Sequence, residues 1–176
     1  MKSTRTILET FERHAELYVA SLDAYSEEQF ARKPDPASWS IGQMYGHLVV
    51  GTNAFHLQHI ARCLEGKGST GGSKKFPGRV IFLIGGFPPA RIKVPPSERY
   101  TPKQPENIAQ MRSGLLQVIG AMRDIEGKVA GSSPQFKSEH PALGFLSARE
   151  WYRLIEMHFR HHLRQKARLE GWLHTV

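Results

Sequence analysis

Four stretches of this sequence repeat apolar residues every three or four positions, and this period limits the folds open to the chain. An α-helix turns once every about 3.6 residues, so each stretch can bury one face of a helix. The pattern predicts helices from about Thr4 to Ala24, from Ser40 to about Glu65, from near Pro105 past Ile125, and from Ser147 to about Glu170. Four such helices predict an all-α fold, a four-helix bundle.

Local signals support the ends of these helices. Ser40 with Gln43, and Ser147 with Glu150, have the spacing of a capping box, in which two side chains satisfy the first free N–H groups. Gly171 follows the fourth apolar stretch and predicts its end.

The segment between the second and third helices differs from the rest. Residues from Gly68 to about Thr101 are rich in glycine and proline, with a short β-like run at Val80–Ile84 and a possible extended piece at Arg91–Val94. A second loop is expected from Gly127 to Gly144. The sequence therefore predicts a bundle with a long crossover, and long loops in compact domains are often functional.

Length and cysteine usage limit the class of protein. The chain has 176 residues, which predicts a single domain over residues 1–176. Its one cysteine, Cys63, excludes an internal disulfide and a cysteine-based zinc site, and suits a cytoplasmic location. No apolar secretion signal follows the N-terminus, and the longest apolar run is far too short to span a bilayer, so we expect no membrane association.

The charge balance permits nucleic-acid binding without establishing it. The 24 Lys and Arg residues outnumber the 16 Asp and Glu residues, for a net charge of +8. On the fourth predicted helix, Arg153, Arg160 and Arg164 lie opposite the apolar face and resemble a solvated surface. No nucleic-acid-binding motif accompanies them, which disfavours that function.

Two histidines of the fourth helix point in the same direction as its apolar residues. His158 and His162 are four residues apart, so they share the face of Trp151, Leu154 and Ile155. This spacing brings two imidazoles within reach of one metal ion, as in helical zinc sites. Burying two unpaired imidazoles costs free energy, which coordination to a metal would offset.

The second helix supplies a third candidate, His47. On a uniform helix His56 falls on the opposite face, whereas the small residues Gly51 and Ala54 follow His47 on its own face. They predict a hollow beside His47, which suits a metal site with three protein ligands and an open position. The alternative is a core histidine bonded to a backbone carbonyl, with Gly51 and Ala54 allowing close helix packing.

Other polar residues near these faces have simpler explanations. Gln43, Gln58 and Gln165 can orient a ligand by hydrogen bonds, although each also fits an amphipathic helix. His161 is expected beside the site or at the surface, and His140 in a structural turn. Phe159 follows His158 where a zinc protease would carry a glutamate, which disfavours a protease.

Two stretches resemble the DinB/YfiT-like superfamily of metal-dependent enzymes. The first, WSIGQMYGHL at Trp39–Leu48, opens the second helix with a tryptophan, a polar cap and a histidine. The second combines HPALGFLSAREW at His140–Trp151 with HFRHHLRQ at His158–Gln165, and is most similar to a branch of unknown function.

This resemblance implies a four-helix bundle of up-down-down-up character and a three-histidine metal site formed by His47, His158 and His162. It also implies nickel or zinc as the metal, with iron or manganese as further options. Characterised members include transferases that use a low-molecular-weight thiol, and some hydrolases, and many are homodimers.

Two functional interpretations follow from the sequence. In the first, an enzyme uses an open metal position to activate water or a thiol toward a small-molecule substrate. In the second, a metal-stabilised bundle binds a ligand or partner without catalysis. The number of protein ligands distinguishes them, because structural sites are closed and catalytic sites keep an open position.

Overall fold

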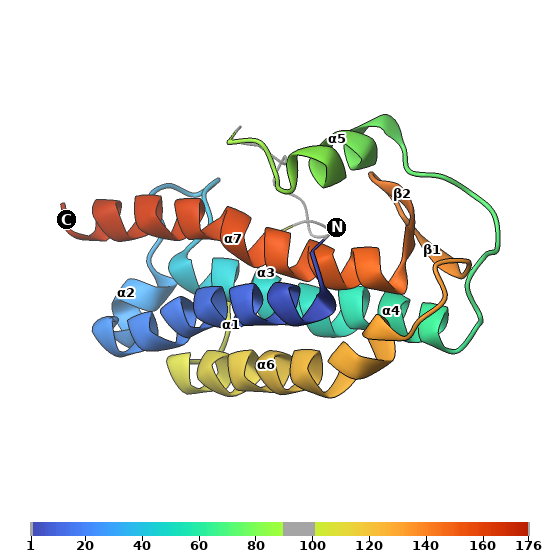
Figure 1. Ribbon diagram of the computed structural model, residues 1–176. Helices are drawn as coiled ribbons and strands as arrows, with labels where there is room; N and C mark the ends of the chain where they lie inside the picture. Colours follow the sequence, from blue (N-terminus) through green and yellow to red (C-terminus); the bar gives the residue numbers. More distant parts are fainter. Residues whose placement is uncertain (1, 90–100, 176) are drawn as a thin grey trace.

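The computed structural model describes residues 2–89 and 101–175 of the chain. Its bundle consists of α1 (Thr4–Ser21), α3 (Ile41–Gly51) continued by α4 (Leu57–Leu64), α6 (Ile108–Ala130) and α7 (Ala148–Leu173) (Figure 1). Helix α1 packs against α6 and α7, and α3 packs against the same two helices from the other side. Figure 1 shows α1 and α7 running one way and α3–α4 and α6 the other, which confirms the up-down-down-up character.

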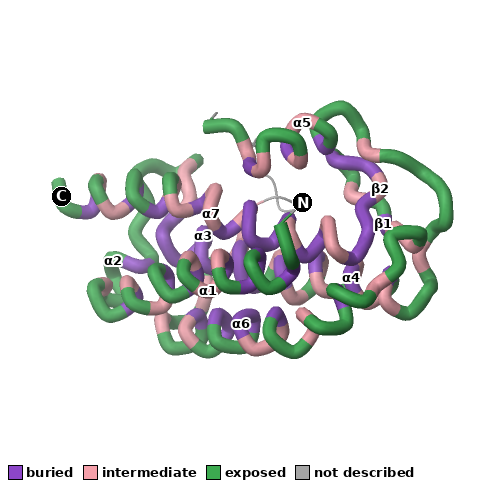
Figure 2. The backbone as a smooth tube through the Cα atoms, in the orientation of Figure 1, coloured by how far each residue is buried: buried purple, intermediate pink, exposed green. Residues whose placement is uncertain are grey.

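The core lies along the axis of the bundle, where the buried faces of the helices meet (Figure 2). Aromatic side chains fill much of it. The largest fully buried ones are Trp151, Tyr18, Tyr45, Tyr152, Phe11, Phe30 and Phe159. Each helix contributes one apolar stripe to this core, as the spacing predicts, and the all-α fold is confirmed.

Several predicted boundaries change. The first helix ends at Ser21 and continues as a 3-10 turn, η1 (Leu22–Ala24), before a short helix, α2 (Glu27–Ala31), that the sequence analysis missed. The third begins at Ile108, because Asn107 caps it by accepting from the Gln110 N–H. The fourth passes Gly171, where an added Cβ would meet nothing within 4 Å, and ends at Leu173.

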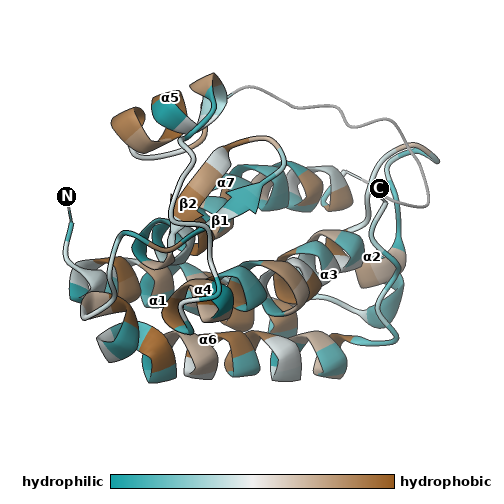
Figure 3. Ribbon diagram, turned by 90° about the vertical axis from the view of Figure 1, so that its right-hand side faces the viewer, coloured by the Kyte–Doolittle hydropathy of each residue, from teal (hydrophilic) through white to brown (hydrophobic). Residues whose placement is uncertain are grey.

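The β-like run at Val80–Ile84 is helical, so that prediction was wrong. It forms the second half of α5 (Phe76–Ile84), which begins with Pro77 in its first turn and ends at Gly85 with φ 73°. A short apolar run does not distinguish a strand from a helix, and here proline and glycine mark the ends of a helix. Figure 3 shows α5 set apart from the bundle. The expected extended piece at Arg91–Val94 lies outside the described residues.

A small hairpin stands where a loop was expected. Strands β1 (Lys137–His140) and β2 (Gly144–Ser147) pair antiparallel and lead directly into α7. The Trp151 indole N–H donates to the carbonyl of Ser138 at 3.3 Å, which ties the hairpin to the helix. Gly78 of α5 approaches the hairpin so closely that a Cβ would lie 2.3 Å from the carbonyl oxygen of Leu143. The hairpin thus fixes both the start of α7 and the position of α5.

No helix within residues 2–89 and 101–175 is long and apolar enough to cross a membrane.

Candidate metal centre

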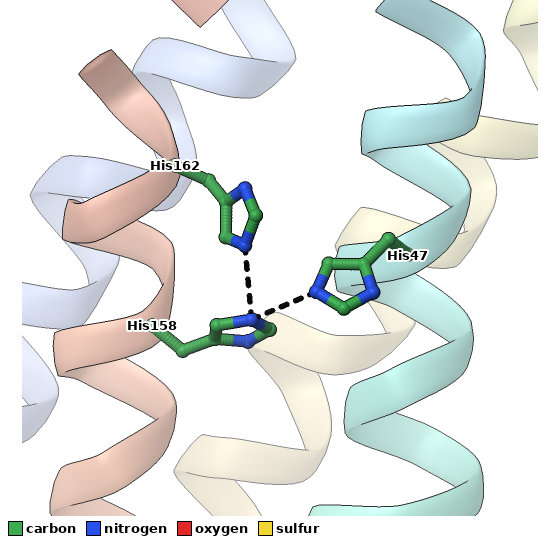
Figure 4. A group of neighbouring side chains, drawn as sticks. All are labelled: His47, His158 and His162. Atoms are coloured by element: carbon green, nitrogen blue, oxygen red, sulfur yellow. Dashed lines mark hydrogen bonds between the residues drawn. The ribbon is translucent and has the colours of Figure 1, made fainter. Parts of the chain in front are cut away.

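The structure brings His47, His158 and His162 together in the middle of the bundle. His47 projects from α3, and the other two project from the facing side of α7, one turn apart (Figure 4). One potential ligand nitrogen from each ring lies within 4.8 Å of the other two. The helix faces inferred from the sequence therefore hold for these three residues.

The three rings meet through their Nε2 atoms. Nε2 of His158 lies 2.9 Å from Nε2 of His47 and 3.1 Å from Nε2 of His162. A ring nitrogen has one in-plane position, which holds either a proton or a lone pair, so it cannot serve two neighbours as a hydrogen-bonding group. Hydrogen bonds alone therefore leave the Nε2 atoms incompletely paired.

A shared cation fits these nitrogens better. Nitrogen ligands of tetrahedral zinc lie about 2.0–2.1 Å from the ion, which places them about 3.3 Å from one another. The two measured separations are close to that value. Three lone pairs directed toward one point are unfavourable by themselves and become favourable around a positive ion. The residues present thus fit a divalent transition metal.

Burial keeps these imidazoles neutral. It lowers the pKa of His47 to about 4 and that of His162 to about 3, and it lowers the pKa of His158 well below the ordinary value. The neighbouring histidines add to the shift of each, because a second positive charge nearby is unfavourable. Neutral rings with free lone pairs are the form that binds metals.

Gln165 orients one of the rings. Its Oε1 lies 2.8 Å from Nδ1 of His162, so Nδ1 carries the proton and donates it to the amide oxygen. The lone pair of His162 is then on Nε2, facing the other two histidines. Such an outer hydrogen bond fixes the tautomer and direction of a metal-binding histidine. The sequence offers this role to three glutamines, and Gln165 has it.

The other two glutamines do not. The Gln43 side chain caps α3, accepting from the Ser40 N–H, and donates to the carbonyl of Pro102 at 2.7 Å. Gln58 is exposed to solvent.

The hollow predicted beside His47 is realised only in part. An added Cβ at Gly51 would meet nothing within 4 Å, so the space there is open. Ala54 instead turns outward and is exposed.

Aromatic rings border the histidines. Trp39 lies against His47, with ring centres 5.2 Å apart. Phe87, which follows α5, lies 6.4 Å from His158 and 5.1 Å from His161. Arg160 of α7 donates to the carbonyl of Gly85 at 2.5 Å, which holds this segment to the bundle. Part of the surroundings of the site is therefore apolar, which strengthens electrostatic interactions there.

The helix face of His56 differs from the predicted one, which is opposite His47. The structure buries His56, and its ring centre lies 5.3 Å from that of His158. The cause is a π-helical turn, η2 (Thr52–His56), in which the Leu57 N–H bonds to the Thr52 carbonyl. A π turn holds one residue more than an α turn. The side chains of later residues are therefore rotated back by about 100° about the helix axis.

The shift is visible in the spacing of the buried positions. The buried positions Leu48, Thr52, His56 and Ile60 follow one another at steps of four. In a regular helix of about 3.6 residues per turn, each step of four turns the side chain by about 40°. Three steps would therefore turn it by about 120°, toward the edge of one face. Two of the four are polar, so a search for apolar residues overlooks the shift.

The remaining candidates have structural roles. Nδ1 of His140 accepts the N–H groups of Ala142 and Leu143, which closes the hairpin turn. Cys63 is buried, and burial raises the pKa of its thiol to about 11, so it is a packing residue. His161 contacts His162 and Phe87 but does not belong to the three-nitrogen group.

Fold and site together define a helical bundle with an inward-facing histidine cluster. A family model described as the DinB superfamily matches residues 10–165, and the chain therefore belongs to that superfamily. No curated protein matches the sequence.

Proposed function

We propose that this protein is a metal-dependent enzyme in which His47, His158 and His162 hold one divalent transition metal. The observation that carries the proposal is the meeting of three neutral Nε2 atoms, one of which faces both others at 2.9 and 3.1 Å. A set of imidazole nitrogens suits nickel, zinc or iron better than magnesium or calcium. Nickel and zinc are the metals we expect first, with iron or manganese as alternatives.

The number of ligands supports catalysis over a purely structural role. Among the described residues the group contains three ligand atoms, whereas structural zinc sites use four. A divalent metal with an open position lowers the pKa of a bound water or thiol and so supplies a nucleophile at neutral pH. Gln165 keeps His162 in the tautomer that presents Nε2. Trp39 and Phe87 supply apolar walls that restrict water around the rings.

The reaction class we propose is transfer of a low-molecular-weight thiol to an electrophile, or hydrolysis of a small molecule. It rests on membership of the DinB superfamily and on the fit of the site to a metal-activated nucleophile. We further propose that residues 1–176 form one domain, that the protein is a cytoplasmic homodimer, and that it does not bind nucleic acid. Light scattering of the purified protein tests the dimer.

Metal content tests the centre itself. We expect protein purified without a histidine tag to carry near one equivalent of a first-row transition metal by elemental analysis. His158→Ala should lose it, because two imidazoles remain. His59→Ala is the matched control, since His59 lies on α4 against Trp151 and outside the three-nitrogen group. Full metal retention in His158→Ala contradicts the proposal.

Activity is tested separately. Metal-loaded and metal-free protein are compared against a panel of electrophiles with several cellular thiols, and against ester and amide substrates. Turnover that depends on both the metal and His158 supports an enzyme. X-ray absorption showing four protein ligands and no exchangeable one would instead favour the non-catalytic binding module.

A further inference from the structure

Unpaired polar atoms gather where η2 faces α7. Oγ1 of Thr52, Nδ1 of His56 and Nδ1 of His158 are all buried and have no hydrogen-bond partner among the described residues. Thr52 and His56 are both buried, and η2 packs against α7. Each unsatisfied buried group costs about 1–3 kcal/mol. Such groups on two elements that pack together indicate a polar network that includes a further member.

The state of His158 decides what this network must accept. Its Nε2 faces His47 and His162, so a neutral His158 that presents a lone pair there carries its proton on Nδ1. Metal-binding histidines almost always donate that second N–H to a carboxylate, a carbonyl or a water. His162 does so through Gln165. His158 has no such partner among the described residues, and the polar ring nearest to it outside the cluster is that of His56.

We propose that His56 is a positioning residue of the metal centre, which holds His158 in its ligand tautomer through one buried water. The water accepts the Nδ1 proton of His158 and donates to Nδ1 of His56, and the Thr52 hydroxyl lies one turn away as a third partner. This inference rests on the proposed three-histidine site. The π turn places His56 for this contact, because without the extra residue His56 would face away from α7.

Two other roles for His56 fit less well. A fourth metal ligand would bring one of its nitrogens into the group of ligand atoms, and within residues 2–89 and 101–175 that group contains His47, His158 and His162 without His56. A packing residue would not need nitrogen at all, since an apolar side chain avoids the cost of a buried unpaired Nδ1.

Zinc affinity of three variants tests the proposal. His56→Leu keeps the volume and removes the nitrogen, His56→Asn restores a polar group near the position of Nδ1, and His59→Leu is the control. Like His56, His59 contacts Phe55 and Trp151. Unlike His56, it forms a hydrogen bond with Ser138. The dissociation constant is measured by competition with a chromophoric chelator. The visible absorption of cobalt-loaded protein reports ligand geometry independently.

We expect His56→Leu to weaken zinc binding about 10- to 100-fold, the usual range for an outer partner, and to shift the cobalt bands. His56→Asn should recover most of the affinity, and His59→Leu should match the wild type. Unchanged affinity and cobalt spectrum in His56→Leu overturn the inference. So does complete loss of metal, as expected for His158→Ala, because His56 would then be a ligand.

The outcomes separate this inference from the proposed function. If the wild type binds no metal, the three-histidine site itself fails. If His56→Leu does not fold, the zinc-loaded wild type is examined by long-range ¹H–¹⁵N NMR of its histidines. A proton on Nδ1 of His158, protected from exchange, supports the link to His56. A proton on Nε2, or rapid exchange at Nδ1, overturns it.

Discussion

The bundle contains two buried polar regions that differ in how their hydrogen bonds are satisfied. We call the first, formed by Tyr18, Tyr45 and Tyr152, the tyrosine region. Each hydroxyl there donates to a backbone carbonyl, those of Phe159, Tyr18 and Met122 respectively, at 2.8–2.9 Å. All three side chains are fully buried, and burial raises the pKa of each, so they stay neutral.

The second region is the histidine cluster (His47, His158 and His162) with the adjacent His56, and its polar atoms are not all paired among the described residues. Nε2 of His158 is shared between two neighbours, and Nδ1 of His158 and of His56 have no partner among the described residues. The three tyrosines are fully buried, whereas His47 and His158 are only partly buried. The tyrosine region is complete without a ligand and stabilises the scaffold. The Nε2 atoms of the three metal-site histidines are complete only with a bound ion, which is typical of a functional site.

The largest expected effect is stabilisation by metal. A ligand that binds only the folded state raises the free energy of unfolding by about 4 kcal/mol at a thousandfold excess over its dissociation constant. We therefore expect saturating zinc or nickel to raise the thermal midpoint of the wild type clearly. His158→Leu should abolish this rise, whereas Tyr152→Phe should keep it. Calorimetry with and without metal measures the effect, and an equal rise in His158→Leu would contradict the comparison.

Acid should destabilise the metal-free protein through the histidine cluster. Unfolded histidines take up protons below about pH 6.5, whereas His47 and His162 in the folded state do so only near pH 4 and 3. The unfolded state therefore binds more protons as the pH falls from 6.5, and stability falls with it. From pH 7 to 5 we expect a loss of about 2 kcal/mol for each of these two histidines, or about 4 kcal/mol together, since one pKa unit corresponds to about 1.4 kcal/mol.

Denaturant unfolding at several pH values measures this loss. The window above pH 5 excludes most carboxylates, which titrate near pH 4. The tyrosine region does not titrate there, so the acid response belongs to the buried histidines, to which His56 and His140 add their own losses. Equal stability at pH 7 and pH 5 would show that the rings are not buried in their neutral form.

The sequence alone predicts the regular helices of the bundle well. Apolar periodicity identifies the four main helices, and two capping boxes mark the starts of α3 and α7, because these signals are local. The i, i+4 spacing of His158 and His162 gives their common direction for the same reason. Periodicity does not predict the hairpin at Lys137–Ser147. Its strands have four residues each, too few for a clear pattern, and they depend on contacts with the bundle.

The position of His56 was lost for a more specific reason. Sorting residues by face assumes a constant turn per residue, and one π turn breaks that assumption for every residue after it. His47 precedes the turn and was placed correctly, whereas His56, Ala54 and Gln58 were not. The long-range pairing of His47 with α7 came from the family resemblance, since helix periodicity says which face is buried but not which helix it meets.

Replacing a histidine should have opposite effects in the two metal states. Metal-free His158→Leu removes the shared Nε2 and the unpaired Nδ1 and keeps an apolar side chain of similar size. Removing the incompletely paired Nε2 is stabilising, and losing the proposed water bridge from Nδ1 offsets part of this, so we expect a gain of up to about 1 kcal/mol without metal. With metal, the same variant should be less stable than the wild type. Denaturant unfolding of wild type and variant, each with and without metal, measures these free energies of unfolding. A loss of stability above about 2 kcal/mol without metal would mean that Nε2 of His158 is already satisfied without an ion.

The smallest effect is expected from the complete region. Tyr152→Phe removes one hydroxyl that donates to the Met122 carbonyl at 2.9 Å and leaves the ring in place. A neutral hydrogen bond contributes about 1 kcal/mol, and here the lost partner is a carbonyl within α6, which limits the cost of leaving it unpaired. We expect a loss of about 1 kcal/mol that is the same with and without metal, and an unchanged metal affinity. Equality in the two states is the informative result, because a metal-dependent loss would mean that the tyrosine region and the histidine cluster are coupled through α7 and do not act as separate scaffold and site.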